Sequence, residues 1–357
     1  MEESRQQEDV TPWPADGLER VEECPVCGSA MRTLLYKSLT DNIFFCAPGR
    51  WTLYRCTDCN SAFLDPRPTT ATIALAYSSY FTHELASDDA PQSRMGRIKR
   101  GIRNGYLNAR YQVQLHPAIS AGRWITPLLP AKRRAIDEFV RHLPQKEGGR
   151  VADIGCGNGQ FLRIARDLRW QAWGVDLDPK AVETAKKTGA TVLQGGFPDT
   201  GLPSEHFDVV TLSHVIEHVH DPIAALKEAF RILKPGGQIW VATPNLESFG
   251  HARFGRDYIQ IDSPRHLVLF TLASLSSLLA DTGFTNVLSK SCNPNATWSY
   301  SCSYRISSGQ DPATSNVKTL PFTLRLAARF AEFRSIMSSK GDENLILMGE
   351  KRGSSTF

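Results

Sequence analysis

The stretch Asp153-Ile154-Gly155-Cys156-Gly157-Asn158-Gly159 decides the fold of this chain of 357 residues. The short apolar segment Val151-Ala152 precedes it, and apolar residues at helical spacing follow it from Phe161 to Ala165. A strand that passes through glycines into a helix N-terminus is a nucleotide-handling turn, because glycines let the backbone approach a ligand and free N–H groups face it. Strictly alternating glycines, with an acid two residues ahead of the first, differ from the dinucleotide fingerprint GxGxxG. The acid would repel a pyrophosphate, but it suits a ligand that carries an ammonium group or hydroxyls.

The spacing downstream of this turn predicts a doubly wound α/β sheet. We expect further strands at 171–176, 191–193, 207–212, 238–243 and 344–348, separated by segments of helical periodicity. The run 207–212 is continuously apolar, as buried parallel strands are. Asp176 ends a strand, which is where nucleotide folds place a carboxylate for ribose hydroxyls.

Two motifs resemble those of class I methyltransferases that use S-adenosylmethionine (SAM). One is the turn 153–159, and the other is Leu-Lys-Pro-Gly-Gly at 233–237, directly before a strand. The resemblance covers roughly residues 146–292 and the strand 344–348, and it implies a seven-stranded, Rossmann-like sheet. It assigns SAM binding to Asp153, Gly155, Cys156, Gly157, Gly159, Asp176, Leu177, Gly196, Phe197 and Ser213. Where the family often has an acid that meets the adenine amino group, residues 194–197 offer only backbone and an aromatic ring. An ordinary doubly wound domain with a fortuitous glycine turn is the alternative.

Two CxxC pairs stand ahead of this region, Cys24–Cys27 and Cys56–Cys59. Each pair brings two thiolates to one side of a tight turn, and two pairs close a tetrahedral site suited to zinc. The predicted ligands of a structural Zn²⁺ in a zinc ribbon are Cys24, Cys27, Cys56 and Cys59. Iron would use the same ligands, whereas a redox CxxC would not come as a pair. Bacterial methyltransferases of small molecules and saccharides look similar, with a cysteine ribbon ahead of the catalytic domain.

His214, Glu217 and His218 directly follow the predicted strand 207–212, at the end of the sheet where α/β folds bind ligands. If this segment is helical, the three side chains share a face. Ubiquinone-type O-methyltransferases look similar here, with an acid at the position of His214, and in them the trio is associated with a divalent metal. His214 in place of the acid leaves that metal open for this chain. The alternatives are the His-x-x-Glu-His protease motif and a structural role in orienting the loop.

A further candidate is His266, in the loop that follows the strand 238–243. Related methyltransferases often carry a histidine here, close to the acceptor. A base that titrates near neutral pH would help to deprotonate a hydroxyl as the methyl group transfers. The catalytic candidates are therefore His266, His218, His214 and Glu217, with an ordinary surface-loop role as the alternative for His266.

The chain divides into regions of different composition. We expect a disordered leader (1–20), the zinc ribbon as a separate unit (21–68), a helical linker or cap region (69–145), the methyltransferase domain (146–350) and a frayed tail (351–357). Residues 293–342 form an insertion that we expect to cover the acceptor site. Its first part, 293–309, is polar and turn-rich, and 322–337 reads as an amphipathic helix.

The composition is that of an ordinary globular protein, with 41% hydrophobic and 22% charged residues and a formal net charge of +4. That charge is too small to indicate nucleic acid by itself. Neither a signal peptide nor a run long enough for a membrane span is visible, so we expect a cytoplasmic protein. Five cations stand within ten residues, at Arg94, Arg97, Lys99, Arg100 and Arg103. They form either a solvated helix face or a patch for an anionic substrate or lipid headgroups, in which case the protein touches a membrane peripherally.

The sequence therefore predicts a SAM-dependent methyltransferase with a zinc ribbon, acting on a small molecule or saccharide that is anionic or lipid-linked, with oxygen favoured. An rRNA or tRNA methyltransferase with a zinc-containing RNA-binding module is the runner-up, although nucleic acid is the less favoured partner. A non-catalytic zinc-ribbon binding protein with a vestigial SAM fold is the third reading. The intact Asp153, glycines and Asp176 argue against it.

Overall fold

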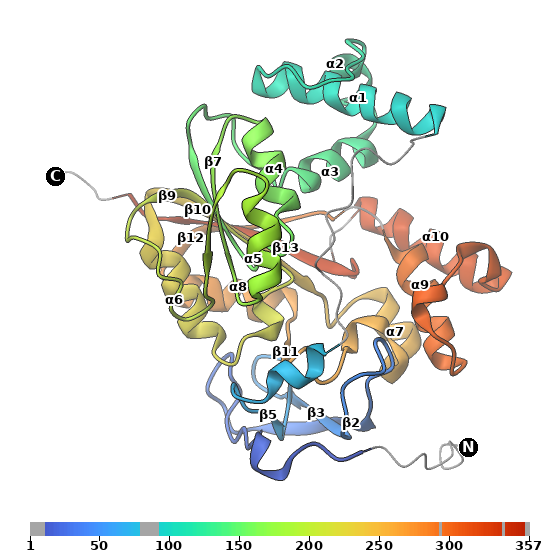
Figure 1. The fold of residues 1–357 in the computed structure, drawn as a ribbon. Coiled ribbons are helices and arrows are strands. Elements are labelled where there is room, and N and C mark those ends of the chain that lie inside the picture. The colour runs from blue at the N-terminus through green and yellow to red at the C-terminus, as the bar shows by residue number, and fades with distance from the viewer. Residues whose placement is uncertain (1–10, 79–92, 293–294, 338–339, 354–357) are drawn as a thin grey trace.

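A seven-stranded sheet lies at the centre of the structure (Figure 1). The computed structural model describes residues 11–78, 93–292, 295–337 and 340–353. The strand order is β12-β13-β10-β9-β6-β7-β8, in which β13 runs antiparallel to both neighbours and all other pairs are parallel. The bounds are β6 (Arg150–Ile154), β7 (Gln171–Asp176), β8 (Thr191–Gln194), β9 (Phe207–Ser213), β10 (Leu233–Pro244), β12 (Phe284–Lys290) and β13 (Asn344–Lys351). This confirms the predicted class I methyltransferase fold, and the strand order reverses between β6 and β9, which is where such sheets bind ligands.

Helices cover both faces of the sheet because the strand residues alternate between two apolar cores. Val151 and Val209 pack with α3 (Pro130–Phe139), α4 (Gln160–Asp167) and α5 (Pro179–Lys186). Their neighbours Ala152 and Val210 belong to the core that includes α6 (Pro222–Ile232) and α8 (Leu272–Asp281). Asp178 and Asp221 cap α5 and α6 through their side chains, with a proline next at the first helical position, so both helix starts are set by sequence.

The N-terminal ribbon is a four-stranded sheet in the order β11-β4-β3-β2. Three strands are local, namely β2 (Arg32–Leu39), β3 (Trp51–Cys56) and β4 (Ala62–Leu64), and β1 (Leu18–Glu19) pairs separately with β5 (Arg67–Pro68). The fourth strand, β11 (Val268–Leu269), comes from the part of the chain that forms the large sheet, between β10 and β12, and pairs with β4. Ribbon residues such as Trp51 and Phe63 also join the apolar core beneath the large sheet. The expectation of a separate ribbon is therefore wrong, because the ribbon shares both a sheet and a core with the domain that follows it.

Helices make up most of the described residues between the ribbon and the sheet. Helix α1 (Arg94–Tyr111) and the short α2 (Gly122–Ile125) form a hairpin at the end of the molecule opposite the ribbon (Figure 1). Leu107 and Tyr111 anchor the hairpin in the core of α3 and α4.

The insertion between β12 and β13 consists of two helices. Helix α10 (Phe322–Met337) confirms that the predicted segment is helical, but of its expected apolar face Leu324 is buried and Leu326, Phe330 and Phe333 are exposed. Residues 296–307, expected to be turn-rich, form α9 (Ala296–Ser307). The sequence misled because the polar residues of α9 point inward, where the Ser299 hydroxyl donates to the buried Glu343 (2.7 Å). Both helices pack beside α7 (Phe249–Phe254).

Some residues that the sequence assigned to the leader and the tail are packed in the described part of the structure. Trp13 is buried against Trp51, with ring centroids 5.2 Å apart, so the leader is structured from there on; residues 1–10 lie outside the described part. Lys351 is buried at the end of β13, and its Nζ donates to the carbonyl of Leu233 (2.8 Å). The predicted tail therefore begins after Lys351.

Short 3₁₀ turns complete the fold. They span Ala15–Gly17, Ile73–Tyr77, Ile216–His218, Gly255–Asp257, Ile259–Ile261, Pro312–Thr314 and Val317–Thr319. Within the described residues, no helix is both long and apolar enough to cross a bilayer.

Candidate active site

The glycines of the turn after β6 have two different tasks. All three have positive φ values, +69° at Gly155, +52° at Gly157 and +81° at Gly159. A Cβ on Gly155 would lie 2.5 Å from Val215, and one on Gly159 would lie 2.8 Å from the Ala185 backbone, so these two glycines permit close packing. Around Gly157, by contrast, nothing lies within 4 Å of the Cβ position. The middle glycine therefore presents bare backbone to open space, as a ligand-binding turn requires.

Asp153, at the base of this turn, is fully buried. One carboxylate oxygen accepts hydrogen bonds from Arg141 and from the hydroxyl of Thr211 (2.9 Å). The other, Oδ2, is buried and has no hydrogen-bond partner among the described residues. Burial raises the pKa of Asp153, while the Arg141 guanidinium opposes that rise. An orphaned carboxylate oxygen in a buried site is costly, and the ammonium group of SAM is a ligand that would satisfy it.

The predicted ribose and adenine residues gather at the carboxyl ends of β7 and β8. Asp176 accepts hydrogen bonds from the backbone N–H groups of Gly157 (2.8 Å) and Asp178 (3.0 Å). Leu177 is 74% exposed and lies against Gly196, where an added Cβ would be 2.9 Å from the leucine side chain. The Leu177 side chain therefore packs directly over the Gly196 backbone.

Cys156 stands inside the turn but is buried. An added Cβ on Gly174 would lie 2.7 Å from its sulfur, so the thiol packs tightly against β7. Burial raises the pKa of Cys156 far above the range in which a thiolate forms. Its place in the cofactor turn is one of packing, with only its backbone available to a ligand.

The catalytic candidates divide into two groups. Glu217, His218 and His266 lie together, with possible ligand atoms all within 4.8 Å of one another, and the two imidazole rings are 4.8 Å apart. His214 stands outside that group and is 46% exposed at its side chain, and its Nδ1 lies 3.2 Å from Glu217. The shared helical face fails because His214 has a φ of +54°, which turns the chain sharply before the 3₁₀ turn Ile216–His218. A helical protease motif is excluded for the same reason.

Each histidine of the inner group has one nitrogen committed to the backbone. Nδ1 of His218 lies 2.9 Å from the carbonyl of Arg265, and Nδ1 of His266 lies 2.8 Å from the carbonyl of Gln260, so both carry their proton on Nδ1. Burial, and then the neighbouring His266, lower the pKa of His218 to about 4. His218 is thus neutral at physiological pH, with a lone pair on Nε2. His266 is 8% exposed, which contradicts a surface-loop role.

Glu217 is the carboxylate of this group. It is fully buried, and its second oxygen accepts from the Thr243 hydroxyl (2.9 Å). Burial would raise the pKa of Glu217, but the hydrogen bond from His214 outweighs it and holds the carboxylate ionised. The same contact with Glu217 raises the pKa of His214 against the desolvation that would lower it.

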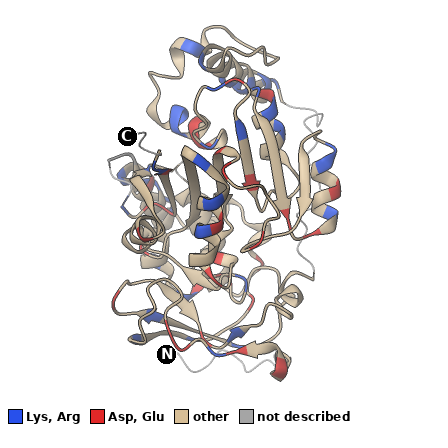
Figure 2. Ribbon diagram, turned by 90° about the vertical axis from the view of Figure 1, so that its left-hand side faces the viewer, with Lys and Arg blue, Asp and Glu red and all other residues tan. Residues whose placement is uncertain are grey.

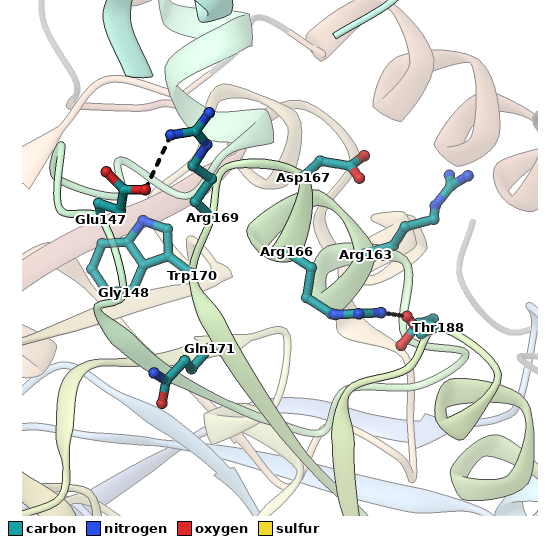
Figure 3. Close-up of a pocket in the computed structure, with 9 residues that line it drawn as sticks. All are labelled: Glu147, Gly148, Arg163, Arg166, Asp167, Arg169, Trp170, Gln171 and Thr188. Atoms are coloured by element: carbon teal, nitrogen blue, oxygen red, sulfur yellow. Dashed lines mark hydrogen bonds and ion pairs between the residues drawn. The ribbon is translucent and has the colours of Figure 1, made fainter. Parts of the chain in front are cut away.

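Two hollows lie near the sheet, at opposite ends of its strands. The smaller, about 280 Å³, lies at the carboxyl ends and is lined by Ser213, His214, Phe139, Arg141 and Trp240, among others. The larger, about 620 Å³, lies around the amino end of β7, where Arg169 projects beside Trp170, while Arg163 and Arg166 project on the opposite side, Arg166 toward the carbonyl of Thr188 (Figure 3). Ligands of such sheets bind at the carboxyl ends, so the smaller hollow is the one beside the chemistry. No described residue of the insertion lines it, so the insertion's role over the acceptor stays a prediction.

The four predicted zinc ligands form one cluster. Their sulfurs all lie within 4.8 Å of one another, with Cys24 and Cys59, and likewise Cys27 and Cys56, 3.6 Å apart. Four thiolates at the usual zinc distance of about 2.3 Å have sulfurs about 3.8 Å apart, so the cluster has the right size. The two turns match, because Gly28 (φ +74°) and Asn60 (φ +62°) each donate an N–H to the first cysteine of their pair. The geometry fits a zinc ribbon.

Comparison with known proteins agrees with this geometry. Residues 130–289 match the family model described as a methyltransferase domain. This part of the chain is a methyltransferase domain. A probable S-adenosylmethionine-dependent methyltransferase of Mycolicibacterium smegmatis is 33% identical over 154 residues, which is 42% of this chain and 58% of that protein. A ubiquinone biosynthesis O-methyltransferase of Xanthomonas axonopodis is 33% identical over 131 residues, 34% of this chain and 55% of that protein. The chain thus spans a little over half the length of these curated relatives.

Solved structures also resemble the methyltransferase domain. A possible histamine N-methyltransferase of Thermotoga maritima is 23% identical with a TM-score of 0.41, and the match covers 65% of this chain and 97% of that one. A SAM-dependent methyltransferase of Archaeoglobus fulgidus is 18% identical with a TM-score of 0.40, covering 64% of this chain and 94% of that one.

Sequence reasoning missed two arginines that organise the site. Arg141 contacts Asp153, and its guanidinium stands 3.9 Å from the centre of the Phe161 ring. Arg265, fully buried, joins the ribbon to the loop of His266. Neither lies in a motif, and nothing local in the sequence distinguishes them from surface arginines.

Proposed function

We propose that the protein transfers a methyl group from SAM to an oxygen atom of a small-molecule or saccharide acceptor. The observation that carries this proposal is the open backbone at Gly157 between two carboxylates at strand ends, Asp153 and Asp176, together with the separate cluster of Glu217, His218 and His266. O-methylation is also what the names of several relatives state for those proteins.

The residues of the turn fit SAM well. Asp153 Oδ2 would accept from the ammonium group, Asp176 from the ribose hydroxyls, and Leu177, Gly196 and Phe197 would flank the adenine. Ser213 and Arg141 line the hollow next to the turn, where Arg141 offers a cation to the cofactor's carboxylate. Bound SAM supplies an electrophilic methyl group on a sulfonium, so the protein's main task is to position the acceptor in line.

We assign the acceptor's proton to the histidine pair. His218 is neutral and holds its Nδ1 proton on a backbone carbonyl, which leaves Nε2 to accept a proton. His266 is oriented in the same way by Gln260. Glu217 stabilises the imidazolium that forms, as a buried carboxylate beside two histidines does. The metal-associated trio of ubiquinone-type enzymes fits poorly, since position 214 holds an imidazole against Glu217 and the close group contains His266 instead.

The cysteine cluster is assigned to a structural Zn²⁺. Four thiolates leave no open coordination position, so the ion contributes to folding and not to the reaction. Reduced thiols of this kind persist in the cytoplasm, where we place the protein.

The test is transfer of radiolabelled methyl from SAM by the purified protein into a fractionated bacterial extract. We expect label in small-molecule or lipid-extractable fractions, in alkali-stable form, as for an ether. Label in RNA would instead favour the runner-up function. Binding of SAM without any transfer would favour a non-catalytic protein.

A further inference from the structure

The hairpin of α1 and α2 carries charge of one sign. Every charged residue between Asp89 and Asp137 is a lysine or an arginine. Seven of these cations lie in the hairpin, namely Arg94, Arg97, Lys99, Arg100, Arg103, Arg110 and Arg123, and Lys132, Arg133 and Arg134 follow in α3. Two of the ten, Arg110 and Arg133, pair with Asp137. Several blue segments lie along this end of the molecule in Figure 2. Such a concentration exceeds what the overall charge of +4 would suggest, so this end has its own electrostatic character.

The same hairpin exposes large apolar side chains. Trp124 is 67% and Leu128 80% exposed in and just after α2, and Met95 is 60% exposed in the first turn of α1. Ile98, Ile125 and Leu129 are also exposed. Water-exposed tryptophan and leucine beside cations are the composition of surfaces that enter the headgroup region of a bilayer.

Glycines hold this hairpin in a fixed shape. A Cβ on Gly105 would lie 1.9 Å from the Ile119 carbonyl oxygen, and one on Gly122 would lie 2.1 Å from the Ile102 carbonyl oxygen. The backbones of α1 and of the segment that leads into α2 are therefore in direct contact. Because no side chains separate them, the apolar residues of α2 cannot fold back between the helices and remain on the outside.

We propose that the hairpin formed by residues 94–129 docks on the anionic phospholipid surface of a membrane. The cations attract the headgroups, and Trp124 and Leu128 insert among them. The lack of any carboxylate between Asp89 and Asp137 argues for an anionic partner, and the exposed tryptophan and leucine argue for lipid over nucleic acid. The hairpin lies at the end opposite the ribbon, so docking leaves the zinc site facing away from the membrane (Figure 1). This inference does not depend on the identity of the methyl acceptor.

The experiment is vesicle flotation with the full-length, zinc-loaded protein. Vesicles are made of phosphatidylcholine alone or with phosphatidylglycerol. We expect binding to the anionic vesicles only, and weaker binding as salt rises. Two double variants test the proposal, Arg97→Glu/Lys99→Glu for charge and Trp124→Ser/Leu128→Ser for apolar insertion. The charge variant should bind at least about tenfold more weakly, since each cation near an anionic bilayer is worth roughly fivefold in affinity. The apolar variant should also bind at least about tenfold more weakly, because the two side chains no longer insert among the headgroups.

Matched control variants distinguish docking through the hairpin from non-specific adsorption to vesicles. Met31→Ser removes a 64%-exposed apolar side chain from the ribbon, and Lys186→Glu/Lys187→Glu reverses two exposed charges at the end of α5. Both should bind vesicles like the wild type, and all variants should keep their thermal unfolding midpoint. The proposal is overturned if anionic vesicles are not bound, if the controls lose binding as much as the hairpin variants do, or if the hairpin variants lose binding to short RNA while vesicles are ignored.

Discussion

Replacing Arg265 should destabilise the whole molecule, because this side chain joins the ribbon to the loop that contains His266. Its guanidinium is fully buried and donates to Asp41 of the ribbon (3.1 Å), to Asp262 (2.8 Å) and to the carbonyl of Ala76 (2.8 Å). Both carboxylates are almost buried, with side chains 1% and 11% exposed. In Arg265→Leu they would lose their shared cation in a place that water does not reach. Removing one partner of a buried ion pair costs about 3–5 kcal/mol, and we expect a loss in that range.

The assay is urea unfolding followed by tryptophan fluorescence and by far-UV circular dichroism. Two of the seven tryptophans, Trp13 and Trp51, lie in the ribbon core, so the fluorescence signal includes the ribbon, while far-UV dichroism is dominated by the helices. The two transitions should coincide in the wild type because ribbon and domain share a core. Arg265→Lys keeps the charge but loses the planar fork, so it should cost less, about 1–3 kcal/mol.

The acid dependence gives a second readout. Burial alone would raise the pKa of Asp41, yet the Arg265 fork lowers it well below its usual range. The stabilisation from this pair is therefore present above the unfolded pKa of about 4 and is lost as the pH falls below it. That acid-dependent loss should shrink in Arg265→Leu. If Arg265→Leu unfolds with a free energy within about 1 kcal/mol of the wild type, and with the same acid dependence, Arg265 does not hold the ribbon and the His266 loop together.

Three further predictions concern the cofactor, the base and the metal. Asp176→Ala should weaken SAM binding by about 1–3 kcal/mol in titration calorimetry, because ribose hydroxyls lose a charged acceptor, and unchanged affinity would overturn the assignment of that strand end. His218→Ala or His266→Ala should lower turnover by about 10²–10⁴-fold at near-normal SAM affinity. Since the pKa of His218 is lowered to about 4, the wild-type rate should stay constant from neutral pH downward and fall only as the pH nears 4. If both histidine variants keep full turnover, neither histidine is the base, and positioning of the acceptor alone accounts for the rate. Metal analysis should find about one zinc per chain. Cys24→Ser should lower the stability of the methyltransferase domain as well as that of the ribbon. A native protein without metal, whose four cysteines react with an alkylating reagent, would contradict the zinc site.

The local signals in the sequence were sufficient for the catalytic sheet and the cysteine site. Alternating glycines, a strand-ending acid and paired CxxC turns each specify backbone geometry within a few residues, and the structure places them as the pattern predicted. Residues 153–159 fix the turn because only glycine accepts those φ values at such close contact. Apolar periodicity then set the strands and the helices on either side.

Only the tertiary structure decided which catalytic candidates meet and how the ribbon is held. His266 lies 48 residues beyond His218 in the sequence, yet their rings are neighbours because the segment after β10 returns to pair with β4 of the ribbon as β11. His214 is only four residues from His218, but the positive φ of His214 turns the chain between them, and no local sequence pattern predicts that turn. Arg265 and Asp41 pair across more than two hundred residues, at a site whose burial removes water from both charges. Pairings of this kind depend on long-range packing, whose energy is gained only once distant segments are already in contact, and no local pattern encodes it.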